Sequence, residues 1–148
     1  MTVLPEWERG TPGVLSVAGP HAIPVSTAVR IADDRLVLAL GSRRETLRRL
    51  RGDPRVALCV LGAGLAFTAY GSASVIREEL EASDSVVAVE LRVERLQDHL
   101  ADGRTDMVDG ARWRWTNDGW AQTERAIVEE LRALSSASEE QSRPADDR

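Results

Sequence analysis

The chain contains no lysine: all 19 of its basic side chains are arginine. Aspartate and glutamate number 24, so the formal net charge is -5, which argues against a nucleic acid as the main partner. A single cysteine, Cys59, excludes an internal disulfide, and we expect a buried core thiol in a reducing cytoplasm. No apolar run is long enough to cross a membrane. Residues 1–7 lack the basic and apolar regions of a signal peptide.

Short β-type segments separated by turn residues dominate the chain. We expect strands over residues 14–17, 23–31, 35–40, 55–61, 65–76, 87–94 and 112–115. The fourth of these strands, 55–61, is nearly all apolar and is expected to be buried on both faces, and Gly71 predicts a bulge or bend. Six or seven strands at hairpin spacing, with one short helix between strands and one at the end, predict a mainly β, antiparallel barrel.

The first helix is expected directly after Ser42, which is a good N-cap. Glu45 lies three residues further on and completes a capping box. Leu47 and Leu50 share one face of this helix and should pack inward. Gly52 is expected to end the helix in the left-handed conformation.

A closing helix is expected near the C-terminus. Asn117 or Asp118 can cap it, and its apolar residues follow helical spacing as far as Leu134. Residues 1–134 are therefore predicted to form a single domain. Residues 135–148 are polar and contain few apolar side chains, so a disordered tail is predicted.

Six arginines gather between residues 43 and 55, within the region of the first helix. A helix N-terminus presents free backbone N–H groups, and guanidinium groups bind phosphate in a bidentate way. The pattern therefore predicts an anion site at the helix start. A solvated, arginine-rich surface helix has the same pattern, and Glu45 would repel an anion at that end.

The order strand, basic helix, Asp-Pro, strand resembles the pyridoxamine 5'-phosphate oxidase-like split β-barrels that bind flavin or deazaflavin. The resemblance covers roughly residues 15–74. Its most specific part is the run Leu-x-x-Asp-Pro-Arg-Val-Ala-Leu at 50–58, and the Gly19-Pro20 turn also contributes. The resemblance implies a homodimer that binds FMN, or a deazaflavin of the F-420 type, in a groove between the subunits.

The resemblance also implies a set of binding residues. By position, these are Val25, Ser26, Thr27, Ala39, Leu40, Ser42, Arg43, Arg44, Thr46 and Arg49. The ring and ribityl chain of the cofactor would lie along residues 25–27, and residues 39 and 40 would flank the ribityl chain. The phosphate would lie near the helix start, where the basic residue usual in the family is displaced and Arg43, Arg44 or Arg49 would compensate.

We find no catalytic residue pattern, which suits an enzyme whose cofactor performs hydride transfer while the protein binds and orients. The acidic loop around His99 has no known metal-ligand spacing, so no metal site is predicted. Trp113, Trp115 and Trp120 form a cluster with two interpretations. They pack in the core or a dimer interface, or they form a wall over the cofactor or substrate.

Our leading hypothesis is an FMN- or F-420-dependent oxidoreductase of a small organic substrate. The alternative is a cofactor-free, non-catalytic split barrel that serves in binding or interaction. Glu45 and Thr46 stand where the family favours cations, and Ala66 stands where its flavin oxidases place glutamine, which favours the alternative. A third possibility is an unrelated small β-barrel that binds an anionic ligand.

Overall fold

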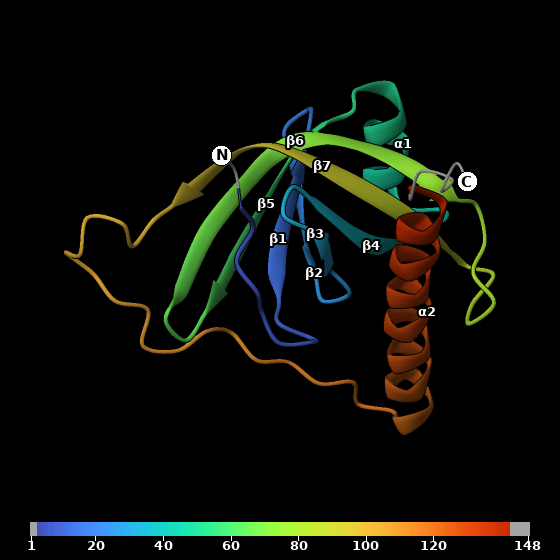
Figure 1. The fold of residues 1–148 in the computed structure, drawn as a ribbon. Coiled ribbons are helices and arrows are strands. Elements are labelled where there is room, and N and C mark those ends of the chain that lie inside the picture. The colour runs from blue at the N-terminus through green and yellow to red at the C-terminus, as the bar shows by residue number, and fades with distance from the viewer. Residues whose placement is uncertain (1–2, 143–148) are drawn as a thin grey trace, which may run out of the picture.

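The computed structural model describes residues 3–142, and side chains up to residue 134. Its elements are β1 (Gly13–Val17), β2 (His21–Val25), β3 (Val29–Ala32), β4 (Arg35–Gly41), α1 (Glu45–Gly52), β5 (Arg55–Gly62), β6 (Leu65–Arg77), β7 (Val86–Asp98) and α2 (Asp118–Ser142). The described strands form one antiparallel sheet in the order β2-β1-β5-β6-β7-β4-β3. The sheet is strongly curved, with α1 and α2 outside it (Figure 1). The predicted mainly β class with peripheral helices is confirmed.

The barrel is split between its two edge strands, β2 and β3. The sequence predicted one strand over 23–31, and this was wrong, because the chain leaves the sheet at residues 26–28. Thr27 Oγ1 accepts a hydrogen bond from the backbone N–H of Ala39 at 3.0 Å and donates to the Ala39 carbonyl at 3.3 Å. The Thr27 hydroxyl therefore makes the two hydrogen bonds with Ala39 of β4 that the backbone of a neighbouring strand would otherwise make. The Trp7 indole N–H donates to the carbonyl of Ala28 at 2.9 Å.

Two hydrophobic clusters lie on opposite faces of β4 and β7. The larger one fills the concave side of the sheet and includes Leu36, Leu38, Leu58, Phe67 and Leu91. The smaller one lies beneath α2, where Ile127, Val128 and Leu131 pack on Val37 and Ala88. Because side chains alternate across a strand, β4 and β7 contribute to both clusters and are buried on both faces.

Strand β5 differs from its prediction, since it is not buried on both faces. Val56, Leu58 and Val60 are buried, whereas Ala57 and Cys59 on the other face are half-buried. The single cysteine is therefore not a fully buried core thiol. The reason is the layer arrangement, because α2 covers the far end of the sheet at β3 and β4 rather than β5.

The long pair β6 and β7 contains the predicted bulge, since the register shifts between Tyr70 and Gly71. β7 continues to Asp98, beyond the end expected from its alternating pattern. The strand predicted over 112–115 is absent, and this segment forms no regular element. A period of two is not sufficient for a strand, which also needs a neighbouring strand with free backbone groups.

Helix α2 begins as predicted. The side-chain oxygen of Asn117 accepts hydrogen bonds from the backbone N–H groups of Gly119 and Trp120, which caps the first turn. The helix continues to Ser142, eight residues beyond the end expected at Leu134, and the disorder of the tail stays a prediction. Alanine and glutamate in that stretch are good helix formers. Residues 143–148 lie outside the described residues.

Within residues 3–142, neither helix contains an apolar stretch of the length that a membrane crossing requires.

Candidate functional site

A cavity of about 360 Å³ lies beside the split in the barrel. Its lining comes from four parts of the chain: residues 23–27, the end of β4 with Arg44, the loop that leads into β7, and the segment from Trp113 into α2. The connection between β2 and β3 is one wall because Thr27 holds it against β4. This cavity is the candidate functional site.

Many of the residues that the sequence predicted for cofactor binding meet in this cavity. They are Val25, Ser26, Thr27, Ala39, Leu40 and Arg44. Ser42 and Arg43 line an adjoining hollow together with Arg44, Asp84 and Ser85. The two hollows share Gly41, Arg44 and Ser85, so the predicted ring-binding and phosphate-binding segments are neighbours in space.

Gly41 determines how Arg44 lies. A Cβ atom at Gly41 would come within 2.9 Å of Arg44 Cγ, so the absence of a side chain lets the arginine lie against the backbone. The backbone N–H of Arg44 donates to the Gly41 carbonyl at 3.1 Å. The backbone N–H of Ser42 donates to the Ser85 carbonyl at 2.8 Å, which ties this turn to the loop before β7.

The start of α1 differs from the capping box predicted for it. The helix begins at Glu45 with Arg44 as its extended N-cap, and no side chain caps it. Ser42 lies two residues before this N-cap, and its backbone N–H is bound to the Ser85 carbonyl. Gly52 does not adopt a positive φ, and the following residue, Asp53, is extended and ends the helix. Leu47 and Leu50 are buried as predicted.

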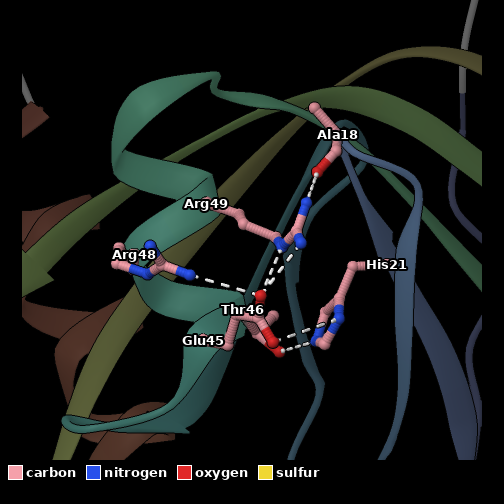
Figure 2. Close-up of polar contacts among 6 residues, drawn as sticks. All are labelled: Ala18, His21, Glu45, Thr46, Arg48 and Arg49. Carbon is pink, nitrogen blue, oxygen red and sulfur yellow. Dashed lines mark hydrogen bonds and ion pairs between the residues drawn. The ribbon is translucent and has the colours of Figure 1, made fainter.

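Thr46 and Arg49 do not reach the cavity. Thr46 is buried, and its hydroxyl lies 3.0 Å from His21 Nε2. Arg49 extends toward the turn after β1, where it donates to the Ala18 carbonyl at 3.4 Å (Figure 2). Gly19 permits this approach, since a Cβ there would lie 1.8 Å from an Arg49 nitrogen. Both residues join α1 to the barrel.

Glu45, which the sequence placed at the anion site, is neutralised within its own helix. Its carboxylate pairs with Arg49 at 2.9 Å and with Arg48 at 3.2 Å (Figure 2). The hydrogen bond from Arg49 is the main reason why the pKa of Glu45 is lowered. His21 lies 3.9 Å from the same carboxylate. Glu45 is therefore turned toward the guanidinium groups of Arg48 and Arg49 and the imidazole ring of His21.

The arginines of the basic stretch fall into two groups. Arg51 pairs with Glu78 at 2.7 Å, and Arg55 pairs with Asp53 at 2.7 Å, in addition to the two pairs of Glu45. Arg43 and Arg44 form no ion pair with any carboxylate of residues 3–134. The two arginines at the start of α1 are thus the ones left to bind an external anion.

The tryptophan cluster is not part of the core of the described chain. Trp113, Trp115 and Trp120 are 51%, 49% and 56% exposed, and all three line the cavity. Glu124 of α2 lies among them, and its carboxylate accepts hydrogen bonds from Ser26 Oγ and from the Trp115 indole N–H. Of the two interpretations of the cluster, the structure thus favours a wall over a bound ligand. Packing against a second subunit stays a prediction.

The sequence analysis did not identify several lining residues. They are Ile23, Pro24, Ser83, Ser85, Val86, Thr123, Glu124 and Ile127. Glu124 precedes Ile127 by three residues on α2, and residues at that spacing share a helix face. This spacing was the only signal for Glu124, and it does not reveal which surface the helix covers.

His99 and the acidic loop show no metal site. His99 Nε2 lies 2.8 Å from the hydroxyl of Thr68, so its ring is held by a neighbouring strand. Among the side chains that the structure describes, those of residues 3–134, no three potential metal ligands lie close enough together to hold an ion.

Solved structures share the architecture of this chain. An F420 reductase is 15% identical and has a TM-score of 0.53, with 64% of this chain and 98% of that one covered. The chain has the split β-barrel fold. A candidate pyridoxamine 5'-phosphate oxidase from Lactobacillus delbrueckii is 16% identical, with a TM-score of 0.50 over 58% of this chain and 82% of that one. HupZ from Group A Streptococcus is 11% identical and has a TM-score of 0.52, with 69% of this chain and 90% of that one covered.

These similarities confirm the predicted resemblance at the level of the fold. No protein-family model matches the sequence, and no curated protein matches it.

Proposed function

We propose that the cavity binds FMN or a deazaflavin of the F-420 type, and that the chain is an oxidoreductase of a small organic substrate. The main support is that Val25, Ser26 and Thr27 line the same cavity as Arg44, one of the two arginines of the basic stretch without a carboxylate partner among residues 3–134. The names of two structures with the same fold, a pyridoxamine 5'-phosphate oxidase and an F420 reductase, agree with this class of ligand.

The residues present suit such a ligand. The cavity volume of about 360 Å³ falls within the range of roughly 300–1,000 Å³ for small-molecule sites. Its lining combines apolar side chains and indole rings with a few polar groups, and Gly41 leaves room for the Arg44 side chain. Apolar walls with a few directed polar groups are typical of sites that bind a planar ring and an attached polar chain.

Each part of the lining has a distinct role in this proposal. When bound, the flavin or deazaflavin ring supplies hydride transfer. Arg43 and Arg44 hold the phosphate through charge-assisted, bidentate hydrogen bonds. Thr27 holds the β2–β3 connection in place against β4, so that Ser26 stays at the cavity wall. The indole rings limit the access of water to the ring.

Equilibrium binding of FMN and of F-420 to the purified chain tests the proposal. We expect one of them to bind with micromolar or tighter affinity, and Arg44→Ala to weaken it by about 1.5–3 kcal/mol, the range for charge-assisted hydrogen bonds. The matched control is Arg51→Ala, which removes an arginine of the same stretch that already pairs with Glu78. Equal losses in the two variants would remove Arg44 from the site.

A cofactor-free binding protein is the second candidate. Its support is that Thr46 and Arg49, two of the predicted phosphate ligands, are engaged with His21, Glu45 and the Ala18 carbonyl instead. This candidate predicts that neither FMN nor F-420 binds, while the chain stays folded.

We also propose that the chain forms a homodimer, as the split-barrel resemblance implies. The expected result of sedimentation equilibrium is a mass twice that of the 16.2 kDa chain. A monomer at all concentrations would mean that the cavity of a single chain is the complete site.

A further inference from the structure

One end of the cavity has an unusual composition. Three indole rings, those of Trp113, Trp115 and Trp120, line the cavity together with Glu124, and the Trp115 indole N–H donates to its carboxylate. Each indole is about half exposed, although a buried aromatic side chain removes roughly 150–250 Å² of surface from water. The proposed phosphate contacts use the arginine end of the cavity, and the carboxylate of Glu124 takes no part in them.

The charge of Glu124 is not neutralised by the part of the chain that the structure describes. No arginine or histidine nitrogen of residues 3–134 forms an ion pair with it. Its two partners are neutral donors, the Ser26 hydroxyl and the Trp115 indole N–H at 2.8 Å. The side chain is half-buried, so it has lost part of its hydration. A partly desolvated carboxylate is stabilised by an opposite charge.

The indole rings offer faces to such a charge. The centroids of Trp115 and Trp120 are 6.1 Å apart, and their planes are inclined at 61°. The two rings meet edge to face and form a corner of the cavity lining, and the face of an indole attracts a cation within about 6 Å of the ring centroid. The hydrogen bond from Trp115 to Glu124 fixes the orientation of one ring next to the carboxylate.

We propose that this corner binds an organic cation, such as a quaternary or alkylated ammonium group. The cation contacts the indole faces of Trp115 and Trp120 and is attracted by the carboxylate of Glu124. As a statement about the substrate, this inference rests on the proposed function, whereas the binding of the cation does not require a cofactor.

The charges of the cavity favour a cation over other ligands at this end. A neutral apolar ligand would fill the corner but remove more water from Glu124 without compensating its charge. An anionic group would be repelled by Glu124 and attracted to Arg44, which lines the same cavity. The ligand that suits both ends therefore has a cationic group on the tryptophan side.

Choline and its neutral isostere 3,3-dimethyl-1-butanol provide the test, since they differ in charge but hardly in shape. The probe is the set of indole N–H signals of the four tryptophans in a two-dimensional NMR titration. Choline should shift the signals of Trp115 and Trp120, and that of Trp7, which is bound to the Ala28 carbonyl, should stay constant. We expect the neutral isostere to bind at least about tenfold more weakly.

The decisive variant is Glu124→Gln, which keeps the size of the side chain and removes its charge. It should weaken choline binding about tenfold, and Glu129→Gln, an exposed position on the same helix, should leave it unchanged. Equal binding of choline and its isostere, no shift with either, or equal effects of the two variants would each overturn the inference. FMN and F-420 titrations without choline report separately on the proposed function.

Discussion

At the scale of single residues, Thr27 determines the split in the barrel, because its hydroxyl occupies both the donor and the acceptor position of a strand beside Ala39. Thr27→Val has almost the same shape but leaves the Ala39 N–H without this partner. We expect the free energy of unfolding to fall by about 1–3 kcal/mol in urea denaturation. Thr105→Val, at an exposed position, is the control and should have little effect. An unchanged Thr27→Val variant would show that the break does not depend on the hydroxyl.

Asp53 provides a residue-scale prediction about pH. Hydrogen bonds from the side chain and backbone of Arg55 lower the pKa of Asp53 to about 2. Since this folded-state pKa is below the ordinary value of 3.8, the carboxylate stabilises the fold above pH 3.8, and the contribution is lost as the pH falls toward 2. An NMR titration of the carboxyl carbon should give the lowered pKa, and Arg55→Gln should raise it. A value near 3.8 in the unchanged protein would contradict the pairing.

The capping of α1 shows why some residue roles were not predictable. Ser42 and Glu45 have the spacing of a capping box, but the Ser42 backbone is held by Ser85, and Glu45 binds Arg49 instead. The contact with Ser85 depends on the tertiary structure, whereas the Glu45–Arg49 pair is a local i,i+4 contact that competes with the capping box. Leu47 and Leu50 were predictable because helical spacing alone places them on one face.

At the scale of elements, the bulge between β6 and β7 depends on Gly71 of β6, which lies at the point where β7 carries the extra residue. A Cβ atom at this position would lie 1.9 Å from the backbone oxygen of Arg92 on β7, so a side chain requires the two strands to separate. Gly71→Ala should lower the free energy of unfolding by about 1–3 kcal/mol or more, the usual range for overpacking. Gly52→Ala is the matched control, since nothing lies within 4 Å of its Cβ position at the end of α1. Equal stability of the two variants would show that the bulge can relax.

Whether a helix or strand could be predicted depends on how far apart in the sequence its contacts lie. Hairpins such as β3–β4 were predictable because their partners are adjacent in sequence. The segment 112–115 alternates like a strand, but it crosses from β7 to α2 and contributes tryptophans to the cavity instead. The gap at 26–28 arises from side-chain hydrogen bonds that a pattern of β-branched residues does not contain.

At the scale of the whole molecule, the candidate site divides into a predictable and an unpredictable half. Residues 25–27, 39–40 and Arg44 were found because the resemblance to the split barrels covers that part of the chain. The opposite wall, with Trp115 and Glu124, comes from the C-terminal third, where the resemblance is weak. That wall exists only because α2 packs on β3 and β4, which is a long-range property of the fold.

The packing of α2 has a consequence for the stability of the whole chain. Leu131 is fully buried in the cluster beneath α2, and the strands β4 and β7 under it also contribute to the main core. Leu131→Ala should therefore lower the stability of both clusters together, by about 2–5 kcal/mol as for other buried leucines. Leu61→Ala, at an exposed position, is the control.

Two signals can follow the thermal unfolding of the Leu131→Ala variant. Far-ultraviolet circular dichroism reports on the helices, and the indole N–H signal of Trp7 reports on the main core, because this ring packs on Phe67 with centroids 5.6 Å apart. Both signals should be lost at the same, lowered midpoint, since β4 and β7 cannot lose one buried face and keep the other intact. A Trp7 signal that persists after the helical signal has disappeared would mean that α2 unfolds separately. The cavity wall of Trp115, Trp120 and Glu124 would then open before the barrel does.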